Sequence, residues 1–175
     1  VVCRKEDTEQ TLLEKIRLAT ILGTYQSTLT NFPYLSKQWK KNCDEERLLG
    51  VSLTGQWDCP TVREAALLKK LKARAIEVNK EYAERFGINQ STAITCVKPH
   101  GNSGQLLSVG SGMHPWYAPY FIRRVRISHT DTLLKMARDQ GVPTLPEVGQ
   151  SAESATTYVL EFPVKAPEGA IFKDE

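Results

Sequence analysis

The stretch of residues 92–115, T-A-I-T-C-V-K-P-H-G-N-S-G-Q-L-L-S-V-G-S-G-M-H-P, decides which fold and function the chain is expected to have. The short apolar run at residues 93–97 predicts a buried strand. Pro99 and Gly101 break that strand, and a helix is expected to begin at Asn102 or Ser103. A strand followed by a turn, small polar residues and a helix is typical of an anion site.

Three features of this stretch suit a phosphate. The first N–H groups of a helix have no partner within the helix, and the helix dipole adds about half a positive charge there. Gly101 and Gly104 allow a ligand to approach the main chain, while Asn102 and Ser103 add side-chain donors. The alternative interpretation is a polar strand-to-helix turn that binds nothing, because glycine-rich turns are weak signals by themselves.

Composition restricts the class of protein. With 175 residues, 41% hydrophobic and 25% charged, the chain can bury one core as a soluble globular protein. No apolar run is long enough to cross a membrane and the first residues do not resemble a signal peptide, so a cytoplasmic location is expected. The net charge of +3 is too small to argue for nucleic acid.

The four cysteines do not predict a metal centre or a disulfide framework. They are widely spaced, contain no C-x-x-C and have no histidine at a zinc-ligand spacing. Reduced thiols and no metal site are therefore expected at these positions: Cys3, Cys43, Cys59 and Cys96. Cys96 itself, inside the apolar run, is expected to be a buried small hydrophobic residue.

Apolar periodicity predicts alternating helices and strands. Helices are expected from Asp7 to about Thr30, from Pro33 to about Arg47, from Thr61 to Gly87 and from Asp131 to Gln140. Capping boxes are expected at the first helix, from Asp7 with Gln10, and at the third, from Thr61 with Glu64. Strands are expected at residues 48–54, 120–128 and 158–162, with a loop at 143–156.

Strands separated by helices imply βαβ units, and hence a mainly parallel sheet or barrel. Ligands of such folds gather at the carboxyl ends of the strands. Thr54, Gly55, Lys98 and Pro99 are expected at those ends.

Three motifs occur in order along the chain. They are E-R-L-L-G-V-S-L-T-G at residues 46–55, I-T-C-V-K-P-H-G-N-S-G-Q-L-L at 94–107 and S-G-M-H-P-W-Y-A-P-Y-F-I-R-R-V-R at 111–126. Together they resemble ribonucleotide reductase, and most closely the monomeric, adenosylcobalamin-dependent ribonucleoside-triphosphate reductases. The resemblance covers essentially all of residues 1–175.

The resemblance implies an α/β fold: a partial ten-stranded α/β barrel, with residues 1–175 as one segment from the C-terminal half of the catalytic domain. It also implies that one loop holds the substrate phosphates. That loop comprises Pro99, His100, Gly101, Asn102, Ser103, Gly104 and Gln105.

The parent enzyme implied by the resemblance converts ribonucleoside triphosphates to 2′-deoxyribonucleotides by thiyl-radical chemistry. It uses adenosylcobalamin as cofactor and a thioredoxin-type reductant, and it is expected to be monomeric. The family's Asn-x-Cys-x-Glu segment and C-terminal cysteine pair are absent from these 175 residues; around Cys43, Lys41 stands where the family has Asn. We therefore expect a fragment that holds no catalytic residue and needs the rest of the parent chain.

Each histidine has two interpretations. His100 could help to hold a phosphate or could crowd the loop, and these alternatives stay open. For His114, packing against the next strand is favoured over proton transfer. His129 is expected to be exposed.

The three arginines of residues 120–128 also allow two interpretations. Period-two geometry places Arg124 and Arg126 on one face of the strand and Arg123 on the other. They could bind triphosphate oxygens, but ion pairs to neighbouring helices or protection of a strand edge are favoured.

Two other functions compete with the reductase fragment. One is a stand-alone nucleotide-binding module, supported by the loop alone. The other is a basic scaffold that meets nucleic acid through Arg123, Arg124 and Arg126 and the lysines between Lys69 and Lys72. The reductase fragment is favoured because it accounts for several motifs in order, and with it neither nucleic acid nor membrane is expected as a partner.

Overall fold

The computed structural model describes residues 1–174, which divide into two compact units. The first unit comprises residues 1–116 together with 167–174, and the second comprises Tyr117–Ala166. Each unit is described by itself. Within the described residues, no helix combines the length and the apolar character that a membrane span requires.

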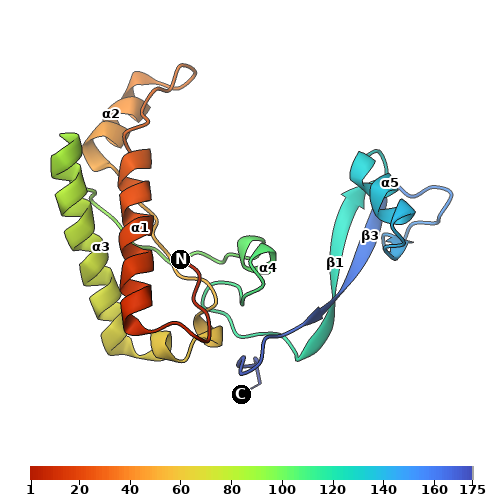
Figure 1. Ribbon diagram of the computed structural model, residues 1–175. Helices are drawn as coiled ribbons and strands as arrows, with labels where there is room; N and C mark the ends of the chain where they lie inside the picture. The colour runs from red at the N-terminus through yellow and green to blue at the C-terminus, as the bar shows by residue number, and fades with distance from the viewer. Residues whose placement is uncertain (175) are drawn as a thin grey trace. The chain divides into compact units, whose positions relative to one another are not determined.

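The first unit is built on two long helices that pack side by side, α1 (Glu9–Gln26) and α3 (Ala65–Phe86) (Figure 1). Apolar residues at helical spacing face the core from both. They include Leu12 and Ile16 of α1 and Leu71 and Ala75 of α3, and all four are buried. Burying a side chain of the size of Leu contributes about 2 kcal/mol, so this contact is a main source of stability for the unit.

The two predicted capping boxes are wrong in their partners. Helix α1 is capped by Thr8 with Thr11, because Asp7 is bound by other groups. Thr61 lies in a short 3₁₀ turn, and its hydroxyl donates to the carbonyl of Asp7 at 2.8 Å. Helix α3 begins at Ala65 without a side-chain cap. Its predicted end is confirmed, since Gly87 adopts the left-handed conformation that closes a helix.

A shorter helix, α2 (Lys37–Glu46), follows α1 and confirms the second predicted helix. Ser36 caps it by accepting a hydrogen bond from the main-chain N–H of Trp39. None of its residues is buried, which agrees with its charged sequence.

Three extended segments of the first unit lie parallel, with helices between them in sequence. Residues 1–3 pair with residues 51–54 through the Val2–Thr54 bridge, and residues 49–51 pair with 93–96 through the Val51–Thr95 bridge. The parallel order agrees with the expected βαβ units. The expected continuous strands are not formed, however, because pairing is limited to these isolated bridges.

The expected burial of residues 93–97 is also wrong. Cys96 is exposed, and Val97 is 73% exposed. Within the described residues, the segment is paired only on the side of residues 49–51, so one of its sides is uncovered.

The second unit is an antiparallel sheet, not a parallel one. Its strands are β1 (Tyr120–Ser128), β2 (Thr144–Pro146) and β3 (Thr157–Lys165), in the spatial order β1-β3-β2. Strand β2 lies inside the predicted 143–156 loop. Helix α5 (Thr132–Asp139), capped by Asp131, confirms the predicted helix after β1. The described residues thus form an α/β fold with a small antiparallel sheet, and they do not by themselves make a ten-stranded barrel.

Arginines of β1 are engaged in ion pairs, but their partners lie on or beside neighbouring strands and not on the neighbouring helices expected from the sequence. Arg124 Nε lies 2.8 Å from a carboxylate oxygen of Glu161 on the neighbouring strand β3. Arg126 pairs with Glu147, which follows β2. These carboxylates compete with any phosphate for the two guanidinium groups.

Candidate functional site

The candidate loop, residues 99–105, leads into α4 (Ser103–Leu106), a single helical turn. The predicted helix start is therefore confirmed, with Asn102 as the N-cap residue. The side chains of Asn102 and Ser103 are exposed, whereas Gly104 is buried. A Cβ on Gly104 would lie only 3.1 Å from the carbonyl oxygen of Gly110, so the loop packs closely on the chain behind it at this glycine.

The donors at this turn come from the main chain and from side chains. Among residues 1–174, the main-chain N–H groups of Asn102 and Ser103 have no hydrogen-bond acceptor, and the Asn102 side chain caps nothing. A four-residue helix sums few peptide dipoles, so the dipole contribution is smaller than the sequence suggested. Individual hydrogen bonds must supply most of any affinity for an anion.

His100 begins the turn and bridges two hydroxyl groups. Its Nε2 lies 2.7 Å from the Oγ of Ser52, and its Nδ1 lies 2.9 Å from the Oγ of Ser103. Partial burial, the α-amino group of Val1 and the ammonium of Lys98 all lower the pKa of His100 below its ordinary value. The ring is therefore biased toward its neutral form.

The chain behind the loop is held by two polar side chains, Thr54 at the end of the 49–54 segment and Asp58 in the turn that follows it. Thr54 Oγ1 donates to the carbonyl of Gly110 and accepts from the N–H of Gly112, both at 2.9 Å. The Asp58 carboxylate accepts from the N–H of Gly110 at 2.7 Å and from the indole N–H of Trp116 at 2.5 Å. Thr54 was expected at a strand end. The sequence did not predict a role for Asp58, and the only signal it offers is the position of this residue in the W-D-C-P turn.

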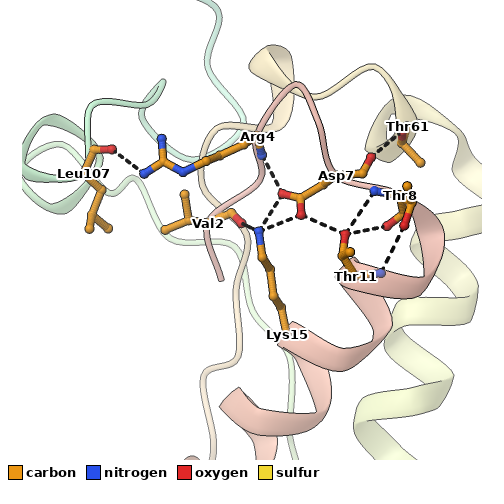
Figure 2. A network of polar contacts seen from close by, with 8 residues as sticks. All are labelled: Val2, Arg4, Asp7, Thr8, Thr11, Lys15, Thr61 and Leu107. Carbon is orange, nitrogen blue, oxygen red and sulfur yellow. Dashed lines mark hydrogen bonds and ion pairs between the residues drawn. The ribbon is translucent and has the colours of Figure 1, made fainter.

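A polar network centred on Asp7 supports the other end of α4 (Figure 2). The Asp7 carboxylate is buried and accepts hydrogen bonds from Lys15 Nζ at 2.6 and 2.7 Å, from the main-chain N–H of Arg4 at 2.8 Å and from Thr11. Arg4 in turn donates to the carbonyl of Leu107 at 3.0 Å. The first residues of the chain thus fix the residue that follows α4.

Lys98 and His100 open onto a groove with a volume of about 840 Å³. Ser52 lines the same groove, and a Cβ on Gly50 would lie 2.8 Å from Lys98 Nζ, so the ammonium lies directly over that glycine. Lys98 therefore brings a positive charge next to the start of the loop. Lys98 and Pro99 were expected beside the strand ends and lie where the 93–96 segment runs into the turn.

The other two histidines, His114 and His129, form their described hydrogen bonds with residues outside the loop. His114 is exposed, with Nδ1 3.0 Å from the carbonyl oxygen of Ser111. His129 is exposed as expected, and it contacts the carbonyl of Thr156. All four cysteines are free, and residues 1–174 contain no cluster of three or more potential metal ligands.

No protein-family model matches the chain. Similar proteins are the adenosylcobalamin-dependent ribonucleoside-triphosphate reductases of three lactobacilli. The Lactobacillus gasseri protein is 28% identical over 184 residues, covering 89% of this chain and 24% of that protein. The Lactobacillus acidophilus and Lactobacillus helveticus proteins are 35% and 37% identical over 100 and 91 residues, covering 57% and 52% of this chain.

The chain is homologous to part of these reductases. The expected resemblance is thereby confirmed. A crystal structure of a B12-dependent class II ribonucleotide reductase shares the fold, with a TM-score of 0.67 over 90% of this chain and 25% of that protein, at 24% identity. The chain thus spans about a quarter or less of the length of the reductases it matches.

Proposed function

We propose that this chain is a segment of an adenosylcobalamin-dependent ribonucleoside-triphosphate reductase, and that residues 99–105 hold the phosphates of the substrate. The parent enzyme would reduce ribonucleotides to 2′-deoxyribonucleotides by thiyl-radical chemistry, with a thioredoxin-type protein as reductant. The three parallel segments of the first unit would belong to its ten-stranded barrel. The homology to the reductases supports the reaction, and the loop geometry supports the assignment of the phosphates.

The observation that carries the loop assignment is the pair of main-chain N–H groups of Asn102 and Ser103 that have no acceptor among the described residues. Both residues are exposed. Main-chain N–H groups at a turn, together with hydroxyl and amide side chains, form a concave set of donors for phosphate oxygens. Lys98 adds a cation near the same turn without being paired to a carboxylate in residues 1–174.

The rigid support of the loop is what would make it useful in the parent enzyme. Ser52, Thr54, Asp58 and Arg4 hold its two ends and the chain behind it. Fixing the phosphates fixes the position of the ribose, and a misplacement of about 1 Å can cost on the order of a hundredfold in rate. The contribution of this segment is therefore orientation of the substrate.

The described residues do not identify a cobalamin site. Every buried side-chain nitrogen and oxygen atom in the described residues already has a hydrogen-bond partner, and both ring nitrogens of His100 contact serine hydroxyls. In the described part of the chain, no buried polar side chain therefore lacks a hydrogen-bond partner that a corrin could supply. We therefore assign no residue of this chain and no step to the cofactor.

The double substitution Asn102→Ala with Ser103→Ala tests the loop in the full-length parent enzyme. Loss of two side-chain donors to a charged phosphate should lower kcat/KM for a ribonucleoside triphosphate by roughly one to two orders of magnitude. Adenosylcobalamin binding, followed by its absorption spectrum, should stay unchanged. The matched control is Ser151→Ala with Ser154→Ala, an exposed polar pair of the second unit. Unchanged kcat/KM in the loop variant would refute the assignment.

The alternative of a stand-alone nucleotide-binding module predicts a different result. A module would bind nucleoside triphosphate tightly as the 175-residue chain, with base and ribose contributing. The reductase segment should bind inorganic tripolyphosphate and a ribonucleoside triphosphate with similar affinity, because only the phosphates contact the loop. Calorimetric titration of the chain with both ligands distinguishes the two.

A further inference from the structure

We propose that His100 is a positioning residue that turns the Ser103 hydroxyl toward a bound phosphate, while Ser52 holds the opposite side of its ring. This inference rests on the proposed function of the loop. It extends that function by making the strength of phosphate binding depend on the protonation of one side chain.

The two serines that flank the imidazole differ in their surroundings. Ser52 is buried in the segment that pairs with residues 93–96, whereas Ser103 is exposed at the first position of α4. Their hydroxyl oxygens lie 2.7 and 2.9 Å from the two ring nitrogens. Ser52 is therefore the anchor, and Ser103 is the partner that can face a ligand.

The main chain at His100 also holds the ring in place. Its φ of 52° lies in the left-handed region, which is unfavourable for a residue with a Cβ by about 1 kcal/mol. The residue keeps this conformation because hydrogen bonds hold both sides of its side chain and because its carbonyl accepts from the N–H of Gly104 at 2.9 Å. The ring direction is thus determined by the fold before any ligand arrives.

The number of ring protons decides what Ser103 can offer. A neutral imidazole has one donor and one acceptor, so in one tautomer Nδ1 accepts the Ser103 proton and that hydroxyl cannot donate to a phosphate. A protonated ring donates to both serines. It then leaves the Ser103 proton free to point at a phosphate oxygen and adds a positive charge beside it.

The charges around His100 favour the neutral ring in the free chain. Burial, the α-amino group of Val1 and the Lys98 ammonium lower its pKa, while Glu46 and Arg47 are the other charged groups that line the same groove. A bound phosphate has the opposite effect, because its negative charge stabilises the imidazolium. Phosphate binding should therefore be accompanied by proton uptake at His100, and it should become tighter as the pH falls through the pKa of His100.

The test measures binding of inorganic tripolyphosphate to the 175-residue chain by calorimetry at about pH 8 and about pH 6. Wild-type binding should tighten by about fivefold more than binding to His100→Asn over this interval, the size of one solvent-exposed ion pair. Asn tolerates the left-handed conformation and can still hydrogen-bond, but it does not titrate. Proton NMR of the ring should show that tripolyphosphate raises the pKa of His100.

Two further variants separate positioning from general effects. Ser52→Ala removes the anchor and should reduce the pH effect, although the charge of His100 remains. His129→Asn, at an exposed histidine of the second unit, should leave the pH effect unchanged. Equal pH dependence in wild type and His100→Asn, with binding intact, would overturn this inference and leave the proposed loop function standing. An absence of tripolyphosphate binding to the wild-type chain at both pH values would overturn both.

Discussion

Asp7 shows how one side chain can connect several parts of the first unit. Burial by itself opposes ionisation of its carboxyl group, but hydrogen bonds from Lys15, the N–H of Arg4 and Thr11 outweigh burial and hold its pKa below the ordinary value of 3.8. Its main-chain carbonyl also accepts from Thr61. The residues that contact Asp7 therefore come from the start of the chain, from α1 and from the turn before α3.

The substitution Asp7→Asn should destabilise the first unit by about 2 kcal/mol, because it removes the charge that compensates Lys15 while keeping the shape of the side chain. The measurement is denaturant unfolding followed by tryptophan fluorescence, since Trp39, Trp57 and Trp116 all lie in the first unit. Glu14→Gln, which breaks an exposed pair with Arg17, is the control and should hardly change the midpoint. Equal midpoints for Asp7→Asn and wild type would contradict the stabilising role.

The same substitution has a pH signature. Because the folded-state pKa of Asp7 is lower than the unfolded value near 3.8, its stabilisation is present above that value and is lost as the pH falls through the folded pKa. The stability difference between wild type and Asp7→Asn should therefore be full at neutral pH and vanish in acid. A difference that persisted in strong acid would show that the network does not act through the carboxylate.

At the scale of residues, the sequence predicted the turn at residues 99–105 better than it predicted the contacts that support this turn. The small polar residues of 99–105 were identifiable because turn chemistry depends on local residue type. Asp58 and Ser52 were not, because their roles arise from partners more than 40 positions away in sequence. The predicted burial of Cys96 was wrong for a related reason: an apolar run does not reveal whether its second side is covered.

At the scale of helices and strands, Gly55 and Gly87 both adopt the left-handed conformation, but they differ in how closely other atoms surround them. Gly55 follows the central extended segment at φ 77°, and a Cβ there would lie 2.6 Å from the Cys3 carbonyl oxygen and 3.0 Å from Val109 Cβ. Gly87 ends α3 at φ 65°, with no atom within 4 Å of such a Cβ. Gly55 therefore carries a packing requirement that Gly87 lacks.

Alanine at these positions should give different losses of stability. Gly87→Ala should cost about 1 kcal/mol from backbone strain alone. Gly55→Ala should cost about 3 kcal/mol or more, because the segment must move away from residues 1–3. Thermal unfolding of the two variants gives the comparison. Similar melting temperatures would mean that residues 1–3 yield easily, which would contradict a close-packed contact at Gly55.

The helices were predicted more accurately than the strands. Periods of three and four residues, together with Gly87 and Asp131 as end signals, place α1, α3 and α5 within a few residues of their observed bounds. The sheet partners were not accessible in this way. Residues 120–128 and 158–162 were predicted as strands, and the second of these extends to Thr157–Lys165 in the structure. Their antiparallel pairing and the short β2 between them depend on tertiary contacts.

At the level of the whole molecule, the proposal predicts that the chain is inactive by itself. Supplied with adenosylcobalamin, a ribonucleoside triphosphate and a dithiol, it should form no deoxyribonucleotide. Cys3 and Cys59 are fully buried, and burial raises the pKa of Cys3 to about 12, so neither is placed to react with a ligand. Product analysis by chromatography is the measurement, with the Lactobacillus gasseri reductase as positive control. Any turnover by the chain alone would contradict the proposal.

The limited parallel pairing of the first unit has a consequence for handling the chain in solution. Ile94 and Cys96 use their main-chain groups toward residues 49–51, so the N–H and C=O of Thr95 face away from that pairing, and neither has a partner within residues 1–174. An unpaired N–H and C=O at the edge of extended chain can pair with a strand of another copy. Concentration, more than temperature, should therefore govern how long a preparation stays monodisperse.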